Sequence, residues 1–365
     1  MANNKLISYI APAAPATRRW ASGNELFLRP EIGFTPKWYH DALGIDFGER
    51  WHTDPAYRKK TILKMRAELK HRFQNTSIGK IDQPDTPLDL LTGTFGACTV
   101  SAIYGIPIRY GKDKWPTCEA QYLSDEHVDN LIPPDLETNP FFKQLLSQVE
   151  WIAQEEGFAE GFINWQGVLN NAQRLRGQQL FLDLYENPER AKHLFQCVCT
   201  TMIDAAKILH SHQKEKGINI GFFTISNCLV NMVSSEFYHE FLLPFDKYIA
   251  ESFGCIGVHN CAWNANPYLE SYSQIPHVGY IDMGMDSNLN KARQLFPETR
   301  RAIMYTPMDV VNKTMEQIQV DLERVANEYG PCDIAAADIE AGTPDGKVLE
   351  FIQLCEKINN KYEES

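Results

Sequence analysis

A histidine and a cysteine lie two residues apart in VHNC, residues 258–261, at the end of an apolar run. Side chains two residues apart on a β-strand leave the same face, so His259 and Cys261 could reach one ion. Imidazole and thiolate suit zinc, and a carboxylate is an acceptable third ligand. A thiol bound at the remaining zinc position loses its proton and becomes a nucleophile. The pattern predicts half of a metal site; the alternative is ordinary packing of both residues at the end of a strand.

Other polar residues stand at the ends of further apolar runs. They are Asn227 after FFTIS, Asp282 in VGYID, Tyr305 in AIMYTP, and Asp338 and Glu340 in IAAADIE. Asp338 or Glu340 could complete the metal shell. Asp282 is either a fourth ligand or a hydrogen-bond partner of the histidine, with helix capping as the alternative. Asn227 and Tyr305 are candidates for substrate contact, against a turn role and core packing.

Alternating strand-like and helical segments must position these residues. Apolar runs predict strands within residues 157–165, 218–226, 255–261, 277–284, 301–307 and 332–339. Helices are expected over 54–73, 187–213, 234–253, 314–330 and 343–362. Asp54 with Pro55 indicates one helix start, and Thr314 with Gln317 indicates a capping box at another.

Successive strand–helix units predict a parallel sheet with right-handed crossovers. Their spacing favours a (β/α)8 TIM barrel over residues 76–365, in which working residues lie where strands end. Residues 1–75 form an aromatic-rich N-terminal extension that is expected to pack on the barrel or cover it. The alternative is an open doubly wound sheet, but no glycine-rich dinucleotide loop follows any predicted strand.

Charge and cysteine content exclude several classes of protein. The net charge of −12 argues against a nucleic acid as the main partner. Nine scattered cysteines in 365 residues fit a reducing cytoplasm better than a disulfide scaffold. No apolar stretch approaches the roughly 18 residues of a transmembrane helix, and the N-terminus lacks the pattern of a signal peptide. We therefore expect a cytoplasmic protein without a membrane partner.

Several segments resemble the uroporphyrinogen decarboxylase superfamily, and within it the branch of methylcobalamin:thiol methyltransferases. The likeness covers roughly residues 90 to 360. It rests on the order and spacing of NWQGVLNNAQRLRGQQLFLDLYENPERAKHLF, VSSEFYHEFLLPFDKYI, VHNCAWNANPYL, YIDMG and GTPDGKVLEF.

The resemblance implies one zinc ion per chain at His259 and Cys261. It also implies a methyl group that moves between a corrinoid and a thiol or other small acceptor. The chain shows no DxHxxG corrinoid module, so the donor is expected to be methylcobalamin or a separate corrinoid protein. This sequence departs from the branch in AAADIEAGTP, which lacks the later cysteine ligand, and Asp338 or Glu340 could replace it.

That departure keeps other functions open. A harder carboxylate ligand would suit an acceptor such as a folate or a small amine. A decarboxylase like uroporphyrinogen decarboxylase is one alternative, and Arg18 and Arg19 loosely match the arginine pair of that family. A non-catalytic barrel that binds a corrinoid or tetrapyrrole is another.

Overall fold

A parallel β-sheet forms the centre of the computed structural model, which describes residues 20–21, 23, 26–74, 76, 78 and 88–362 and the backbone of 7–10 and 363. Every ladder between its neighbouring strands is parallel. In sheet order the strands are β1 (Ile7–Ile10), β2 (Leu28–Phe34), β9 (Cys332–Ile339), β8 (Arg300–Met304), β7 (Val278–Met283), β6 (Ile256–His259) and β5 (Phe223–Ser226). The carboxyl ends of these strands therefore lie along one edge of the sheet.

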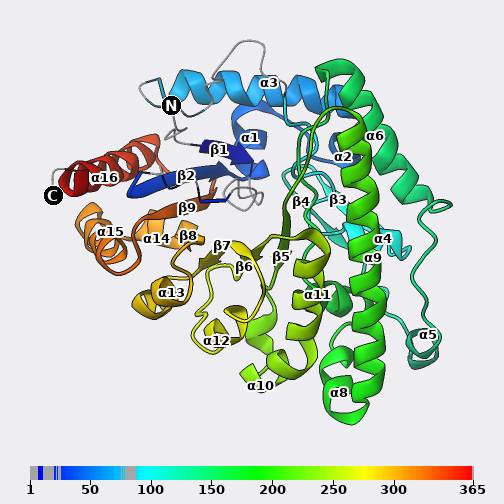
Figure 1. Cartoon of the computed structure of the whole chain (residues 1–365). Helices are drawn as coiled ribbons and strands as arrows, with labels where there is room; N and C mark the ends of the chain where they lie inside the picture. Colours follow the sequence, from blue (N-terminus) through cyan, green and yellow to red (C-terminus); the bar gives the residue numbers. More distant parts are fainter. Residues whose placement is uncertain are drawn as a thin grey trace.

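Helices surround the strands, which gather in the middle of the molecule (Figure 1). They are α1 (Pro36–Leu43), α2 (Glu49–Thr53), α3 (Pro55–Arg72), α4 (Thr99–Ile103), α5 (Asp125–Asp129), α6 (Pro140–Glu156), α7 (Val168–Arg176), α8 (Gln179–Glu186), α9 (Pro188–Glu215), the 3₁₀ turn η2 (Val230–Met232), α10 (Ser235–Phe237), the π-helix η3 (Tyr238–Leu242), α11 (Leu243–Phe253), α12 (Leu269–Tyr272), α13 (Leu289–Leu295), α14 (Pro307–Asn312), α15 (Met315–Tyr329) and α16 (Asp345–Glu363). A separate antiparallel hairpin consists of β3 (Ile108–Gly111) and β4 (Lys114–Cys118).

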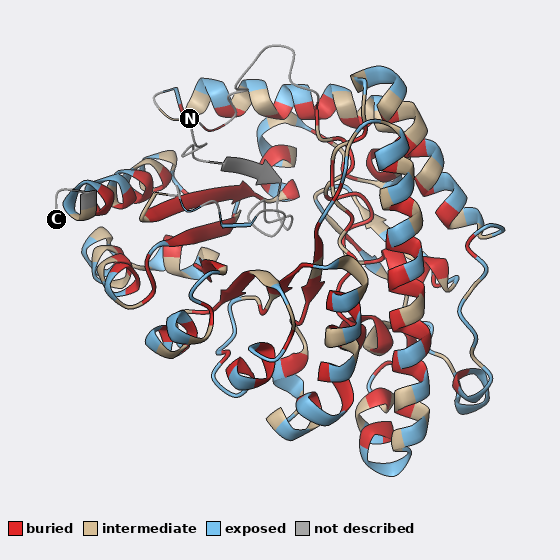
Figure 2. Ribbon diagram, viewed as in Figure 1, coloured by how far each residue is buried: buried red, intermediate tan, exposed pale blue. Residues whose placement is uncertain are grey.

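The burial pattern follows from this arrangement. All seven residues of β2 are buried, as are all five of β8. Figure 2 shows strands that are mostly buried and helices with one buried and one exposed side. Strands covered on both faces often read as apolar runs, as β6 does with IGVH, whereas β2, with the sequence LRPEIGF, does not.

The predicted helix starts are confirmed at two places. The Asp54 side chain accepts a hydrogen bond from Tyr57 N at the start of α3, and Pro55 is the first helical residue. The capping box at α15 is complete: Thr314 Oγ1 accepts from Gln317 N, and Gln317 Oε1 accepts from Thr314 N. Each contact satisfies an amide at a helix end that would otherwise lack a partner.

Residues 157–165 were expected to be a strand, but the structure shows no regular strand there. Phe162 N donates to the Thr92 side chain at 2.9 Å. A Cβ on Gly161 would lie 2.7 Å from Leu91 Cβ, so this segment packs closely on the chain around residue 91. Glycine permits that approach and also the backbone φ of +135°. Among the described residues the parallel sheet runs from β1 to β5, and these two strands do not pair to close a ring.

The N-terminal section contributes to the sheet itself. Residues 28–34, which the sequence analysis assigns to an extension, form β2 and pair with β9 along most of its length. The Asn359 side chain on α16 bonds both backbone groups of Leu28, at 2.6 and 2.7 Å. The first and last parts of the described chain are thus packed together.

No helix in the described part of the chain combines the length and apolar character needed to cross a membrane.

Candidate metal centre

His259 is the last residue of β6, and Cys261 lies in the turn that follows. The sequence pattern predicts that His259 and Cys261 lie on one strand. Cys261 instead has a backbone φ of +61°, in the left-handed region. A residue other than glycine adopts this conformation at a cost of about 1 kcal/mol or more. The turn, and not strand alternation, therefore directs the Cys261 side chain toward His259.

Asp282, at the end of the neighbouring strand β7, stabilises this turn. One carboxylate oxygen accepts from Asn260 N at 2.9 Å and from Cys261 N at 3.0 Å. The other accepts from Tyr280 Oη at 3.0 Å and lies 2.6 Å from His259 Nδ1. A carboxylate can only accept, so His259 carries its proton on Nδ1 and leaves Nε2 free to bind a metal. Asp282 is fully buried and orients the histidine from behind.

Cys228 follows β5 and reaches the same place. The backbone before it is held to β6, because Asn227 N donates to His259 O at 2.7 Å. The Asn227 side chain donates to buried Asp246 on α11 at 2.9 Å. The sequence analysis did not single out Cys228, although it stands just beyond a predicted strand, where the same rule selected His259. Only its closeness to the other two residues distinguishes it from the remaining cysteines.

Cys228, His259 and Cys261 form the one group of three or more potential ligands in the described residues whose donor atoms all lie within 4.8 Å of one another. Bond lengths of about 2.3 Å to sulfur and about 2.0 Å to nitrogen put the donors of a tetrahedral zinc site about 3.5 to 3.8 Å apart. Small side-chain rotations would bring the three atoms to that spacing. Two sulfurs and one imidazole nitrogen are a donor set that zinc favours, so the residues fit this ion.

The electrostatics also suit a cation. Burial acts to lower the pKa of His259, but Asp282 and Cys228 together raise it well above its usual value. Contact with Cys228, supported by His259, lowers the pKa of Cys261 to about 4 despite burial. The same contact raises the pKa of Cys228, and burial adds to that rise. These shifts favour the thiolate form of Cys261, which is the form that binds a metal, and metal binding would displace any proton on Cys228 and on His259 Nε2.

Asp338 and Glu340, the predicted third ligands, lie outside this compact group. Asp338 is near enough for its charge to interact with Cys261 and His259. Burial, with a contribution from the Cys261 thiolate, raises its pKa to about 6. Glu340 is exposed, and its carboxylate accepts a hydrogen bond from Thr35 at 3.5 Å. Their predicted role as ligands stays a prediction, and Cys228 is the better placed third donor.

Tyr305 and Asn227 are both engaged with protein groups. Tyr305 is buried and donates from its hydroxyl to Asp321 on α15 at 2.7 Å. This contact matches the packing alternative considered for Tyr305. Asn227 supports the loop of Cys228 through Asp246, which matches its alternative role in a turn. Arg18 and Arg19 lie outside the described residues.

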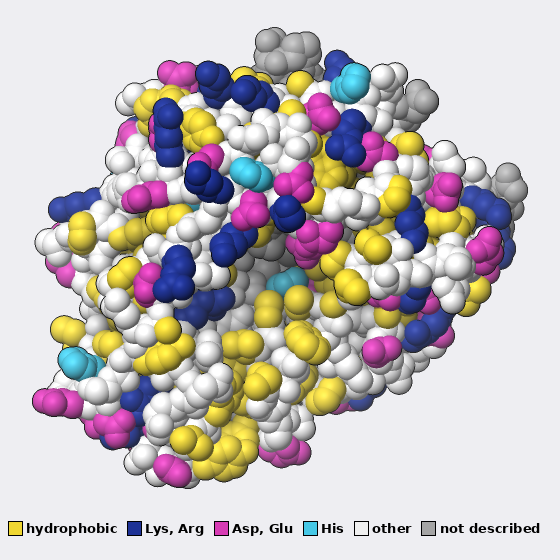
Figure 3. Space-filling model, turned by 180° about the vertical axis from the view of Figure 1, so that it is seen from behind, with side chains coloured by type: hydrophobic (Ala, Val, Ile, Leu, Met, Phe, Trp, Pro, Cys, Tyr) yellow, Lys and Arg dark blue, Asp and Glu magenta, His cyan; other side chains and the backbone are white. Residues whose placement is uncertain are grey.

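The group is accessible from outside. The His259 side chain is 18% exposed, and Cys228 and Cys261 are both half-buried. A large apolar side chain stands a few residues after each cysteine in the sequence. Met232 is 57% exposed and Trp263 is 50% exposed. One face of the molecule is hollowed near its centre, with hydrophobic side chains gathered below the hollow and charged ones above it (Figure 3).

Comparison with known proteins gives a likeness of fold. No sequence model of a protein family matches the chain, and no curated protein matches it. Among solved structures, a methyltransferase from Methanosarcina mazei is similar, with a TM-score of 0.59 and 13% sequence identity. The alignment covers 88% of this chain and 90% of that one.

Two further structures match more weakly. A B12-independent methionine synthase from Shewanella sp. W3-18-1, in complex with selenomethionine, has a TM-score of 0.43 at 12% identity, over 84% of this chain and 91% of that one. A putative vitamin-B12-independent methionine synthase from Listeria monocytogenes has a TM-score of 0.41 at 12% identity, over 62% and 71%. The match to the Methanosarcina protein shows that this chain shares its overall fold.

Proposed function

We propose that this chain is a zinc-dependent methyltransferase whose metal ligands are Cys228, His259 and Cys261. The observation that carries the proposal is the convergence of these three side chains, from two strand ends, on one half-buried point. The shared fold with a protein described as a methyltransferase supports the same class of reaction.

Three protein ligands leave one zinc position for a substrate. Zinc bound there would act as a Lewis acid that lowers the pKa of a coordinated thiol, so that the thiolate can act as a nucleophile at neutral pH. The chain's own residues do the remaining work. Asp282 fixes the tautomer and direction of His259 and holds the turn of Cys261. Asp338, beside the group, offers a carboxylate that could interact with the acceptor.

The methyl donor is proposed to be a corrinoid, free or carried by a separate protein, and the acceptor a thiol or another small nucleophile. The exposed apolar side chains of Met232 and Trp263 stand beside the ligand loops. Exposed apolar surface of this kind suits contact with a large, partly apolar donor.

The test is the metal content of protein purified without added metal. We expect about one zinc per chain, with loss of zinc in Cys228→Ser, His259→Ala and Cys261→Ser. Cys355→Ala, at a buried cysteine on α16, is the matched control and should keep its zinc. Asp338→Asn should also keep its zinc if Cys228 is the third ligand.

Zinc-loaded protein should then move a methyl group from methylcobalamin to one member of a panel of small thiols. The visible spectrum of the corrinoid measures this transfer. A protein that takes up no zinc when it is supplied would contradict the proposal. Zinc loss in Asp338→Asn but not in Cys228→Ser would replace the third ligand and leave the rest standing.

A further inference from the structure

The loop that carries Cys228 is held on both sides. On one side, Asn227 N donates to the carbonyl of His259 at 2.7 Å. On the other, Leu229 N donates to the side-chain oxygen of Asn170, on α7, at 3.2 Å. Cys228 lies between these two anchors. The first anchor is backbone to backbone, whereas the second depends on the Asn170 side chain.

The Asn170 side chain is buried and its direction is determined by its neighbours. Its Nδ2 donates to Gln166 Oε1 at 3.0 Å. Gln166 Nε2 in turn donates to Asn164 Oδ1 at 2.8 Å. Each side-chain amide has one accepting oxygen and one donating nitrogen, so this chain of three amides runs in a single direction. Reversing Asn170 would place its NH₂ group against the N–H of Leu229.

The segment with these amides is packed tightly against the loop. Gln166 is buried and has a backbone φ of +60°, a left-handed conformation that costs of order 1 kcal/mol for a residue other than glycine. A Cβ on Gly167 would lie 2.6 Å from both Ser226 O and Asn227 Oδ1. The backbone at residue 167 therefore touches the end of β5. This close approach leaves the loop little room to shift while the Asn170 bond is intact.

We propose that Asn170 is a positioning residue for the third metal ligand, because it holds Leu229 N and thereby places the Cys228 sulfur beside His259 and Cys261. The inference rests on the proposed function for its metal, but the position of the loop can be tested without any metal. Loss of the acceptor at residue 170 frees the second anchor and lets the sulfur move out of the group.

The experiment compares Asn170→Leu, which has similar volume and no acceptor, with Asn170→Asp, which keeps an acceptor for Leu229 N. Asn170→Ala replaces the leucine variant if that one does not fold. The matched control is Asn359→Leu, which removes another buried amide that bonds only the backbone of Leu28. Two quantities are measured: zinc affinity by competition with a chromophoric chelator, and the rate of Cys228 alkylation by iodoacetamide in metal-free protein.

We expect zinc affinity to fall about 10- to 100-fold in Asn170→Leu, the size seen when a group that orients a ligand is removed. Cys228 should also react faster in that variant. Asn170→Asp and Asn359→Leu should retain affinity and alkylation rate close to those of the unaltered chain. The spectrum of cobalt-substituted protein should lose part of its thiolate-to-cobalt absorption in Asn170→Leu alone.

Unchanged affinity and alkylation in Asn170→Leu would overturn the inference. Equal losses in Asn359→Leu would overturn it too, since the effect would then be general loosening. If the unaltered chain bound no zinc, the proposed function would fail, while the alkylation rates would still decide whether Asn170 holds the loop.

Discussion

Asp282 holds both the imidazole of His259 and the turn that carries Cys261. Its buried carboxylate accepts hydrogen bonds from two successive backbone amides of the turn and from the Tyr280 hydroxyl. It also accepts a hydrogen bond from Nδ1–H of His259. The left-handed conformation of Cys261 persists because these contacts offset its cost. One side chain therefore determines both the direction of the imidazole and the position of the thiolate.

Replacing this carboxylate by an amide should weaken metal binding. In Asp282→Asn the amide oxygen can still accept from Asn260 N and Cys261 N. Its NH₂ group would then face His259 Nδ1, which must become an acceptor and move the proton to Nε2. We expect a 10- to 100-fold loss of zinc affinity, about the usual effect of removing such a partner, measured by chelator competition. Asp286→Asn, at an exposed position in the turn after β7, is the control. Equal affinity in both variants would show that the tautomer of His259 does not depend on Asp282.

At the scale of elements, α11 contains a buried acid behind the Cys228 loop. Asp246 accepts from Tyr238 Oη at 2.7 Å and from Asn227 Nδ2 at 2.9 Å, both on the same oxygen. It follows the π-helix η3, where the proline at 244 interrupts the regular helical bonds. Burial raises the pKa of Asp246 to about 6, although both hydrogen bonds act to lower it.

This raised pKa predicts a pH dependence of stability. The folded state favours the protonated acid, so the cost of ionising Asp246 appears as pH rises through the interval from about 4 to about 6. Asp246→Asn keeps an oxygen for both bonds and cannot ionise. Its unfolding free energy, relative to the unaltered chain, should therefore increase by about 2 kcal/mol between pH ~4 and pH ~7.

Urea unfolding at a series of pH values measures this difference. Asp41→Asn, an exposed residue paired with Lys37, should show little change over the same range. A constant difference between Asp246→Asn and the unaltered chain at all pH values would refute the expectation.

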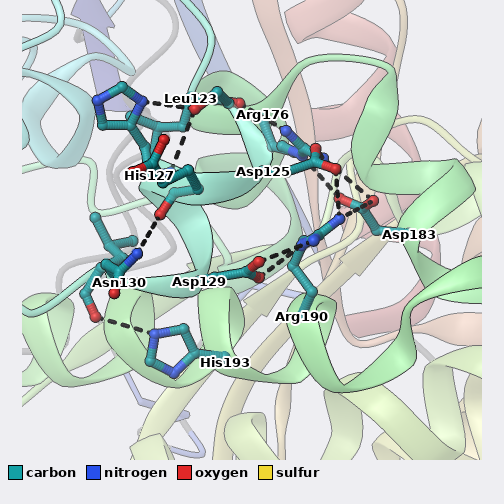
Figure 4. A network of polar contacts seen from close by, with 12 residues as sticks. Leu123, Asp125, His127, Asp129, Asn130, Arg176, Asp183, Arg190 and His193 are labelled. Carbon is teal, nitrogen blue, oxygen red and sulfur yellow. Dashed lines mark hydrogen bonds and ion pairs between the residues drawn. The ribbon is translucent and has the colours of Figure 1, made fainter.

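A second element-scale feature is the ion network that joins α5 to α7, α8 and α9 (Figure 4). Arg176 at the end of α7 bonds buried Asp183 on α8 at 2.7 Å, and it also bonds Asp125 on α5 and the carbonyl of Leu123. Arg190 on α9 pairs with Asp129 at 2.7 Å. The buried members of this network are satisfied by several partners, which is the condition under which burial of charge is tolerated.

Removing Arg176 should be costly because it leaves Asp183 buried with only a distant partner, Arg190 at 3.8 Å. Arg176→Met is expected to lower the unfolding free energy by about 3 to 5 kcal/mol. Arg109→Met, which breaks an exposed pair with Glu119, should change the unfolding free energy very little, because water and salt screen such pairs. Denaturant titration of both variants compares them directly, and similar costs would mean that burial of the Arg176 pair adds nothing.

At the scale of the whole molecule, the ends of the chain are part of one structure. β2 pairs with β9, all of its residues are buried, and α16 bonds its first residue. A chain that starts at residue 36 would expose the edge of β9 and the inner face of α16. We expect the truncated chain to unfold without a cooperative transition. Circular dichroism recorded during heating measures this. A sharp unfolding transition in the truncated chain would show that residues 28–34 are a dispensable extension after all.

The sequence by itself determined several of the elements and part of the site's chemistry. Apolar runs located β5 to β9 because strands buried on both faces need continuous apolar residues. Capping residues at Asp54 and Thr314 located two helix starts, since those contacts are local. Polar residues at strand ends pointed to His259, Cys261 and Asp282, because parallel strands bring such residues to one edge.

Only the tertiary structure decided which residues meet. Cys228 is more than thirty positions from Cys261. It stands just beyond a predicted strand, but only the pairing of β5 with β6 brings its loop beside that of Cys261. The sequence also could not show that residues 28–34 form a strand of the central sheet, because their partner β9 lies some three hundred residues later. Residues 157–165 read as a strand, yet their backbone bonds a threonine side chain. Contacts between distant segments, and not local propensity, decided all three.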